Sequence, residues 1–388
     1  MNGLKASLHV ILAAATMFSI TVEAQPPVFV QPQALSQEGR FMPGSGNEAI
    51  VRTRYTVKAD GTTDDIEILG GFSNQSLDNT LRQTIRNWTF TPGTVNGEAA
   101  DFYNQEYTFS IRVNPNAPAV PALPPGGRRR GAPPAQNTAA GENAEASPSS
   151  QILDLSKVPA PELALSSGVR EEFDKITAMV AEKDHDKALK AVDKLIRREL
   201  HSVFDYCLAQ EMKSSILMAM EKPFEALEAS KLATVGAENA QGGFDHFLTP
   251  DILEDALRKK FLLAATLRQA ALAWETYELL QSRFSLAPDD KIHEQARTIR
   301  SLLDSPEPLP LLAKIDDDKW TYTPVRRIFT VTNVDGRLSR IDARCERKNL
   351  QLEYQADVDW TLPEALGRCQ LDFVGKNGTQ FTVYEFTE

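Results

Sequence analysis

Residues 49–61 read AIVRTRYTVKADG, and this stretch decides the fold of the first part of the chain. Apolar and polar residues alternate along it, which is typical of a strand with one buried face. Val51 and Tyr55 lie on the face that we expect to be buried, and Arg54 lies on the opposite face. The dipeptide Asp60-Gly61 then predicts a hairpin turn, because glycine accepts a positive φ without steric cost.

The residues after this turn predict a second strand, a helix and a final strand. Apolar side chains recur at helical spacing from Leu77 to Trp88. The helical pattern runs directly into Trp88-Thr89-Phe90-Thr91-Pro92. Alternation then returns up to Val113, with Tyr107 and Phe109 on one face. The predicted order is therefore strand, hairpin, strand, helix, strand.

This order resembles the C-terminal domain of the TonB energy transducers, above all through the W-x-F-x-P pattern at the end of the helix. We assign residues 26–113 to this domain, and residues 50–113 carry the pattern. Two features depart from the family. The Tyr-Pro pair that usually opens the domain is missing, and residues 44–49 replace the usual Gly pair before the first strand.

The resemblance implies an α+β domain whose sheet edge receives a strand from an outer-membrane receptor. Backbone hydrogen bonds supply the affinity in such strand addition, and alternate side chains supply the specificity. The final strand is the candidate edge. We weigh this equally against an ordinary strand whose Tyr107 and Phe109 serve only the core. The candidate binding residues are Glu106, Tyr107, Thr108, Phe109, Ser110, Ile111, Arg112 and Val113.

Residues 1–24 are expected to form a signal peptide that directs the chain to the periplasm. The apolar run Leu8–Val22 ends at the small-x-small pattern Val22-Glu23-Ala24. This run is shorter than the roughly 20 residues that a membrane-spanning helix needs. An uncleaved anchor in the inner membrane is the alternative, and only in that case do we expect contact with a membrane.

Residues 114–155 are rich in Pro, Ala and Gly, so we expect a disordered linker. TonB transducers carry a membrane helix, a Pro-rich spacer and then this domain, whereas here the linker follows the domain. Helical periodicity covers residues 160–305 and predicts antiparallel helix pairs that resemble degenerate tetratricopeptide repeats. A plain helical spacer is the alternative. The small residues that carry this resemblance are Ala188, Ala226 and Ala271 or Ala273.

Short strands return over residues 312–388, which predicts a small, mostly antiparallel β domain. The sequence from Trp360 to Pro363 interrupts the pattern. In an oxidising compartment, Cys345 and Cys369 are expected to form a disulfide, with inert core thiols as the alternative. The whole chain is therefore expected to be multidomain: an α+β domain, an all-α repeat domain and a β domain.

The charge and the motifs exclude several classes of function. A net charge of −11 argues against a nucleic-acid partner, because phosphate contacts require a basic surface. The histidines, cysteines and carboxylates show neither metal-ligand spacing nor a catalytic motif. We therefore expect no enzyme activity, no catalytic residue, no cofactor and no metal.

Two functions remain as hypotheses. The first is a periplasmic interaction or scaffold factor that binds envelope proteins or peptides by strand addition and in a helical-repeat groove. The second is a membrane-anchored energy transducer of the TonB family that serves outer-membrane receptors.

Overall fold

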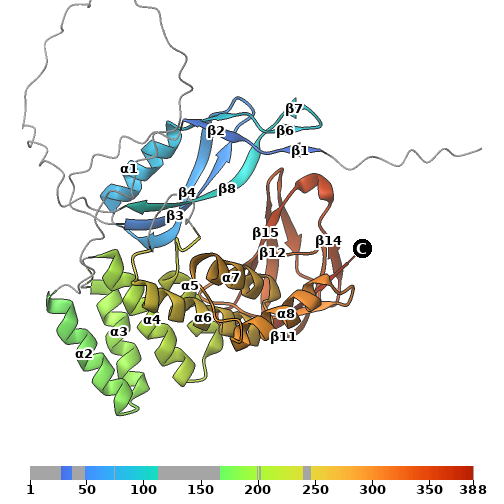
Figure 1. Cartoon of the computed structure of the whole chain (residues 1–388). Coiled ribbons are helices and arrows are strands. Elements are labelled where there is room, and N and C mark those ends of the chain that lie inside the picture. Colours follow the sequence, from blue (N-terminus) through green and yellow to red (C-terminus); the bar gives the residue numbers. More distant parts are fainter. Residues whose placement is uncertain are drawn as a thin grey trace, which may run out of the picture.

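The protein is described by a computed structural model over residues 28–36, 49–73, 75–111, 167–198, 200, 202–238 and 246–387. The predicted signal peptide and linker lie outside these residues. Figure 1 shows three regions in contact: an N-terminal sheet region in blue, a helical region in green to orange, and a C-terminal strand region in red. Mixed helices and antiparallel sheets confirm the coarse α+β expectation.

The N-terminal sheet region is built on a three-stranded antiparallel sheet in the order β4-β3-β8. Helix α1 packs against β4, and two smaller pairings, β1-β6-β7 and β2-β5, flank the sheet. The elements are β1 (Phe29–Val30), β2 (Gln33–Ser36), β3 (Ala49–Val57), β4 (Thr63–Phe72), α1 (Gln75–Arg86), β5 (Thr89–Thr91), β6 (Thr94–Val95), β7 (Glu98–Ala99) and β8 (Phe102–Ile111).

The W-x-F-x-P sequence closes the core of this region against the hairpin turn. Trp88 is 2% exposed and Phe90 is buried beside it. The backbone N–H of Phe90 donates to the carbonyl oxygen of Gly61 at 2.9 Å. Gly61 has a φ of +83°, and a Cβ there would lie 2.2 Å from the Phe90 carbonyl oxygen. Only glycine therefore allows the turn to approach this segment so closely.

Apart from the exposed Arg52, strand β3 is buried on both faces, so the prediction of a half-buried strand is wrong. Val51 and Tyr55 point into the core beneath α1, as expected. On the other face, Ile50 belongs to the core of the helical region, and Arg54 is only 5% exposed. The alternating pattern shows one apolar face, but it does not show that other parts of the chain cover the polar face.

The described residues of the helical region form seven helices, each of which packs against the next. Two apolar cores run through it, one around α2 and α3 and a larger one from α4 to α8. The helices are α2 (Ser167–Ala181), α3 (His185–Arg198), α4 (Val203–Ala219), α5 (Pro223–Ala233), α6 (Pro250–Thr266), α7 (Ala270–Arg283) and α8 (Lys291–Asp304).

Two four-stranded antiparallel sheets form the C-terminal strand region, in the orders β10-β15-β12-β13 and β14-β11-β16-β9. Their facing side chains share one core, in which the rings of Trp320 and Phe381 lie 5.7 Å apart. The strands are β9 (Leu309–Lys314), β10 (Lys319–Tyr322), β11 (Ile328–Asp335), β12 (Leu338–Cys345), β13 (Asn349–Glu353), β14 (Asp359–Thr361), β15 (Cys369–Gly375) and β16 (Gln380–Phe386), with a short 3-10 turn at Glu364–Leu366.

The predicted disulfide is confirmed, and Cys345 and Cys369 lie directly opposite each other on β12 and β15. Closing a loop of this length adds about 3 kcal/mol through the unfolded chain. The predicted break at Trp360 is wrong, because Trp360 lies in β14. Its ring stacks on Phe329 of β11, with the ring centroids 5.5 Å apart.

Candidate functional site

Strand β8 contains six of the eight predicted binding residues and is a terminal strand of its sheet. It pairs antiparallel with β3, with Arg54 opposite Glu106 and Val51 opposite Phe109. Arg112 and Val113, the last two predicted residues, lie outside the described residues. The six described residues alternate between the core and the opposite face, so they do not form one surface.

Glu106 takes part in a charged network that crosses the whole sheet. Its carboxylate contacts Arg54 at 2.9 Å and Arg52 at 3.0 Å. Arg54 also contacts Glu67 at 3.1 Å, and Glu67 and Glu106 are its direct neighbours on β4 and β8. Burial alone would raise the pKa of Glu106, but the two guanidinium groups outweigh it and hold that pKa below its usual value.

Tyr107 and Phe109 belong to an aromatic cluster around Trp88. The Phe109 ring stacks on Trp88 at 5.4 Å and is buried, so Phe109 serves the core. Tyr107 meets the edge of Trp88 at 5.2 Å but remains 40% exposed. Among the described side chains of the predicted set, Tyr107 is thus the large apolar one that is exposed, and it packs against the Trp88 ring.

The remaining described residues of the set lie close to the helical region. The Thr108 hydroxyl lies 3.5 Å from the carboxylate of Glu238, which follows α5. A Cβ at Gly236 would come within 3.3 Å of the Ser110 hydroxyl oxygen, so the backbone passes close to the strand there. Ile111 is the last residue of β8 and pairs with Ala49.

The first residues of β8 are held by the C-terminal strand region. The backbone N–H of Tyr103 donates to the carbonyl oxygen of Glu346 at 2.7 Å, as one more β-strand would. The Asn104 amide donates to the Cys345 carbonyl oxygen at 3.0 Å, and the Arg347 guanidinium lies 5.2 Å from the centre of the Phe102 ring. The section of β8 available to another strand therefore begins after Asn104.

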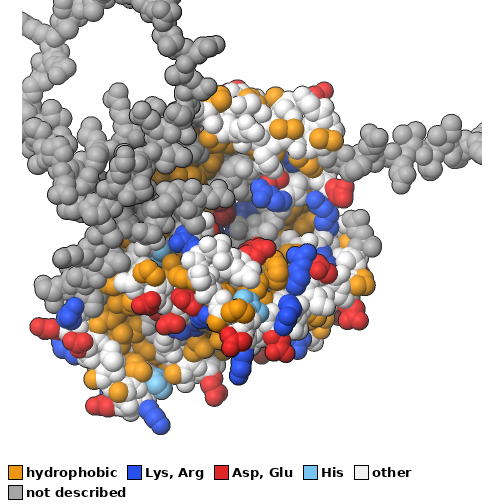
Figure 2. All heavy atoms as spheres, viewed as in Figure 1, with side chains coloured by type: hydrophobic (Ala, Val, Ile, Leu, Met, Phe, Trp, Pro, Cys, Tyr) orange, Lys and Arg blue, Asp and Glu red, His pale blue; other side chains and the backbone are white. Residues whose placement is uncertain are grey.

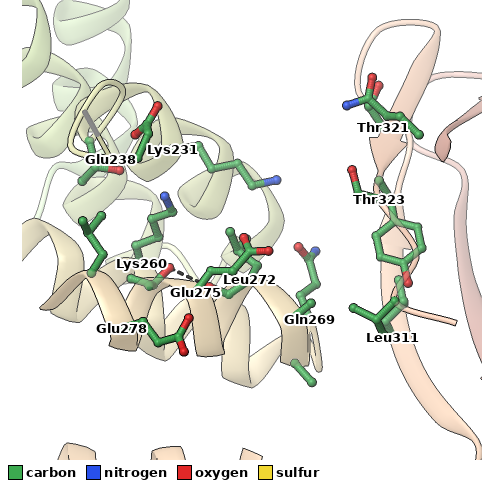
Figure 3. Close-up of a pocket in the computed structure, with 18 of the residues that line it drawn as sticks. Lys231, Glu238, Lys260, Gln269, Leu272, Glu275, Glu278, Leu311, Thr321 and Thr323 are labelled. Carbon is green, nitrogen blue, oxygen red and sulfur yellow. Dashed lines mark hydrogen bonds between the residues drawn. The ribbon is translucent and has the colours of Figure 1, made fainter. Parts of the chain in front are cut away.

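A cavity of about 1050 Å³ lies where the three regions meet. Glu106, Tyr107 and Thr108 contribute to its wall from β8. Figure 3 shows Lys260 and Glu275 on the helical wall, facing Thr321 and Thr323 across the cavity. On the face shown in Figure 2, acidic and basic side chains are interspersed around the junction of the regions.

Two ionisable groups in the cavity wall are strongly affected by burial. The amine of Lys260 on α6 has its pKa lowered by loss of solvent, against the opposing pull of Glu238. Glu385 on β16 is fully buried, and burial raises its pKa to about 8. Its carboxylate accepts hydrogen bonds from the backbone N–H groups of Val325 and Arg326, which reduce that rise.

Both of these residues can be recognised in the sequence, because each is a charged residue at a position where the pattern of its helix or strand calls for an apolar one. Lys260 stands four residues from Ala256 and from Ala264, both fully buried, so it occupies an inward position of α6. Glu385 follows Phe381 and Val383 on the inward face of β16. A charged residue at an apolar position indicates an ionisable group shielded from solvent, which here is fully buried for Glu385 and partly buried for Lys260.

The described residues contain no group of three or more His, Cys, Asp and Glu side chains arranged to hold a metal ion. Within the same residues, no helix combines the length and the apolar character needed to cross a membrane. The arrangement offers a terminal strand and a cavity lined by both polar and apolar side chains.

Comparison with known proteins identifies one part of the chain. Residues 44–112 match the family model for the C-terminal domain of the Gram-negative bacterial TonB protein. This match confirms the resemblance carried by the hairpin and by the W-x-F-x-P sequence. A search of curated proteins gave no match.

Arg54 and Arg52 form a matched pair for testing the charged network. Arg54→Ala removes a buried side chain together with its contacts to Glu67, Glu106 and Gln370, and should lower the free energy of unfolding by about 3 kcal/mol. Arg52→Ala removes only a half-exposed ion pair and should lower it by no more than about 1 kcal/mol. Urea denaturation measures both losses, and equal losses would show that the network does not stabilise the fold.

The raised pKa of Glu385 predicts that the free energy of unfolding declines as the pH rises. Its folded pKa of about 8 exceeds the ordinary value of 4.5, so the folded state holds the proton more tightly than the unfolded state. The protonated Glu385 contributes fully to the free energy of unfolding below about pH 4.5. This contribution is lost as the pH rises towards 8, at up to about 1.4 kcal/mol per pH unit.

Glu385→Gln should remove this decline, whereas Glu353→Gln, at an exposed position of β13, should leave it in place. Urea denaturation of the three proteins between pH 5 and pH 8 provides the measurement. A parallel pH dependence in all three would contradict the assignment.

Proposed function

We propose, from the premise that residues 44–112 form a TonB C-terminal domain, that this protein is an interaction factor of the bacterial cell envelope. The domain relates the chain to envelope proteins, and TonB C-terminal domains interact with outer-membrane receptors. In our proposal, β8 pairs with an extended segment of a partner in the periplasm, and the helical region supplies a second contact surface.

The observation that carries this proposal is the position of β8. It is a terminal strand in the order β4-β3-β8, and its residues 106–108 line the cavity between the regions. An added strand forms backbone hydrogen bonds along such an edge whatever its sequence, so affinity does not require a conserved pocket. The exposed Tyr107 ring adds an apolar contact on the same strand.

The helical region supports a role in binding through the way its helices pack. Ala188, Ala226 and Ala273 are all fully buried, which allows neighbouring helices to approach closely. Residues of α5, α6 and α7 form one wall of the cavity. We propose that these helices are tetratricopeptide-like repeats whose inner surface receives part of the same partner.

The membrane-anchored transducer is the second candidate, and the family match itself favours it. The two candidates differ in the fate of residues 1–24 rather than in the shape of the described regions. For the periplasmic factor, mass spectrometry of the purified protein should find Gln25 at the N-terminus, and osmotic shock should release the protein. An intact Met1 together with retention in carbonate-washed membranes would support the transducer instead.

The strand-addition mechanism predicts contact at Tyr107 in living cells. A photo-crosslinking amino acid at position 107 should capture envelope proteins, because the ring is 40% exposed and stands on the terminal strand. The same group at Val358, which is 36% exposed and does not line the cavity, provides the matched control.

Capture at both positions in equal yield would contradict a specific role for β8. Crosslinks from position 107 only to residues 112–166 of the same chain would contradict binding of a partner there.

A further inference from the structure

The helical wall of the cavity carries charged side chains that lack partners among the described residues. Lys260 on α6, and Glu275 and Glu278 on α7, form no hydrogen bond or ion pair of normal length within the described part of the chain. By contrast, Arg52 is paired with Glu106 and Lys231 with Glu228 in the same wall. The face formed by α6 and α7 therefore presents charged groups to the cavity that are not neutralised by a direct ion pair.

The environment of these groups makes an incoming opposite charge favourable. Glu275 and Glu278 are three residues apart, so they stand on one face of α7 and repel each other. Burial raises the pKa of Glu275, and the Glu278 carboxylate raises it further, against the opposing effect of Lys260. A cation placed between the two carboxylates would relieve this repulsion.

The position of the cavity points to a segment of polypeptide as its occupant. Its volume of about 1050 Å³ is at the upper limit of the roughly 300–1,000 Å³ of small-molecule sites. Residues 106–108 of β8 border the same cavity, so a strand that pairs with β8 would place some of its side chains next to α7. Thr323 on the opposite wall supplies a hydroxyl group for its backbone or side chains, and the Thr321 hydroxyl, which donates to Asp372, can still accept a hydrogen bond.

We infer that the cavity selects, among strands that pair with β8, extended segments of partner proteins with a Lys or Arg side chain that reaches Glu275 and Glu278. This inference rests on the proposed function and adds the charge of the preferred partner. Lys260 opposes the incoming cation, because its own positive charge already acts on Glu275 without forming a direct ion pair. The wall therefore contains both an attracting and a repelling element, and substitutions of the two should have opposite effects.

The test uses the chain from residue 25 to residue 388 and three labelled nonapeptides with blocked ends. The peptides consist of alternating Thr and Val and differ only at the central position, which is Lys, Gln or Glu. Fluorescence anisotropy at low salt should show that the Lys peptide binds about tenfold more tightly than the Gln peptide, with the Glu peptide weaker still.

Two variants that preserve the shape of the wall should then change binding of the Lys peptide in opposite directions. The double variant Glu275→Gln/Glu278→Gln should reduce the tenfold preference for Lys to within about twofold, whereas Lys260→Gln should strengthen binding of the Lys peptide. The pair Glu171→Gln/Glu294→Gln, at exposed positions of α2 and α8 outside the cavity, removes the same net charge and should leave the preference unchanged.

Equal binding of the three peptides, a preference for Glu, no binding by any of them, or an equal effect of the two double variants would overturn the inference. If the charge preference is absent while position 107 still captures envelope proteins, the inference fails and the proposed function stands. If position 107 also captures nothing, the proposed function itself fails.

Discussion

The arrangement of the molecule depends on the guanidinium group of Arg54. It lies at the centre of the N-terminal sheet, between Glu67 on β4 and Glu106 on β8, and it also reaches the side-chain oxygen of Gln370 on β15. A charge with so little solvent contact is tolerable only when several acceptors surround it. Because one acceptor comes from the C-terminal strand region, the sheet and that region must be in contact for the terminal nitrogens of Arg54 to reach all three of their acceptors.

This contact determines which part of β8, and which neighbouring side chains, a partner strand can reach on the TonB C-terminal domain. The first residues of β8 are held by a backbone hydrogen bond to Glu346, and the middle of the strand borders the cavity. Helices cover the other side of β3. A strand added to β8 would meet side chains from all three regions. The same backbone edge can thus acquire a selectivity that a three-stranded sheet alone does not have.

The sequence predicts elements well where local patterns are strong. The alternation around Val51, the Asp60-Gly61 turn and the helical spacing up to Trp88 led to the correct family, because each pattern depends on residues close together in the chain. The pairing of Cys345 with Cys369 was also predictable from their positions on alternating strands and from the expected compartment.

Features formed by distant segments were not predictable in the same way. Arg54 was expected to be exposed, because nothing near it shows that Gln370 would cover it. Trp360 was taken for a break, although it stacks on Phe329, thirty-one positions earlier. The cavity itself combines residues from β8, α6 and β16, so no local window of sequence contains it. Of its charged residues, Lys260 and Glu385 are visible in the sequence as exceptions within apolar patterns.

The separation of Arg54 from Gln370, 316 positions along the chain, also has a consequence for biogenesis. The ribosome completes the N-terminal sheet long before it makes β15, and the α1 side of that sheet can close on local contacts alone. The opposite side must wait for the last part of the polypeptide, including the disulfide at Cys345 that neighbours the contact with Asn104. Contacts between such distant segments form slowly, and surfaces that await them are exposed to aggregation. The opposite face of this domain is therefore completed only after the last strands of the chain have been made.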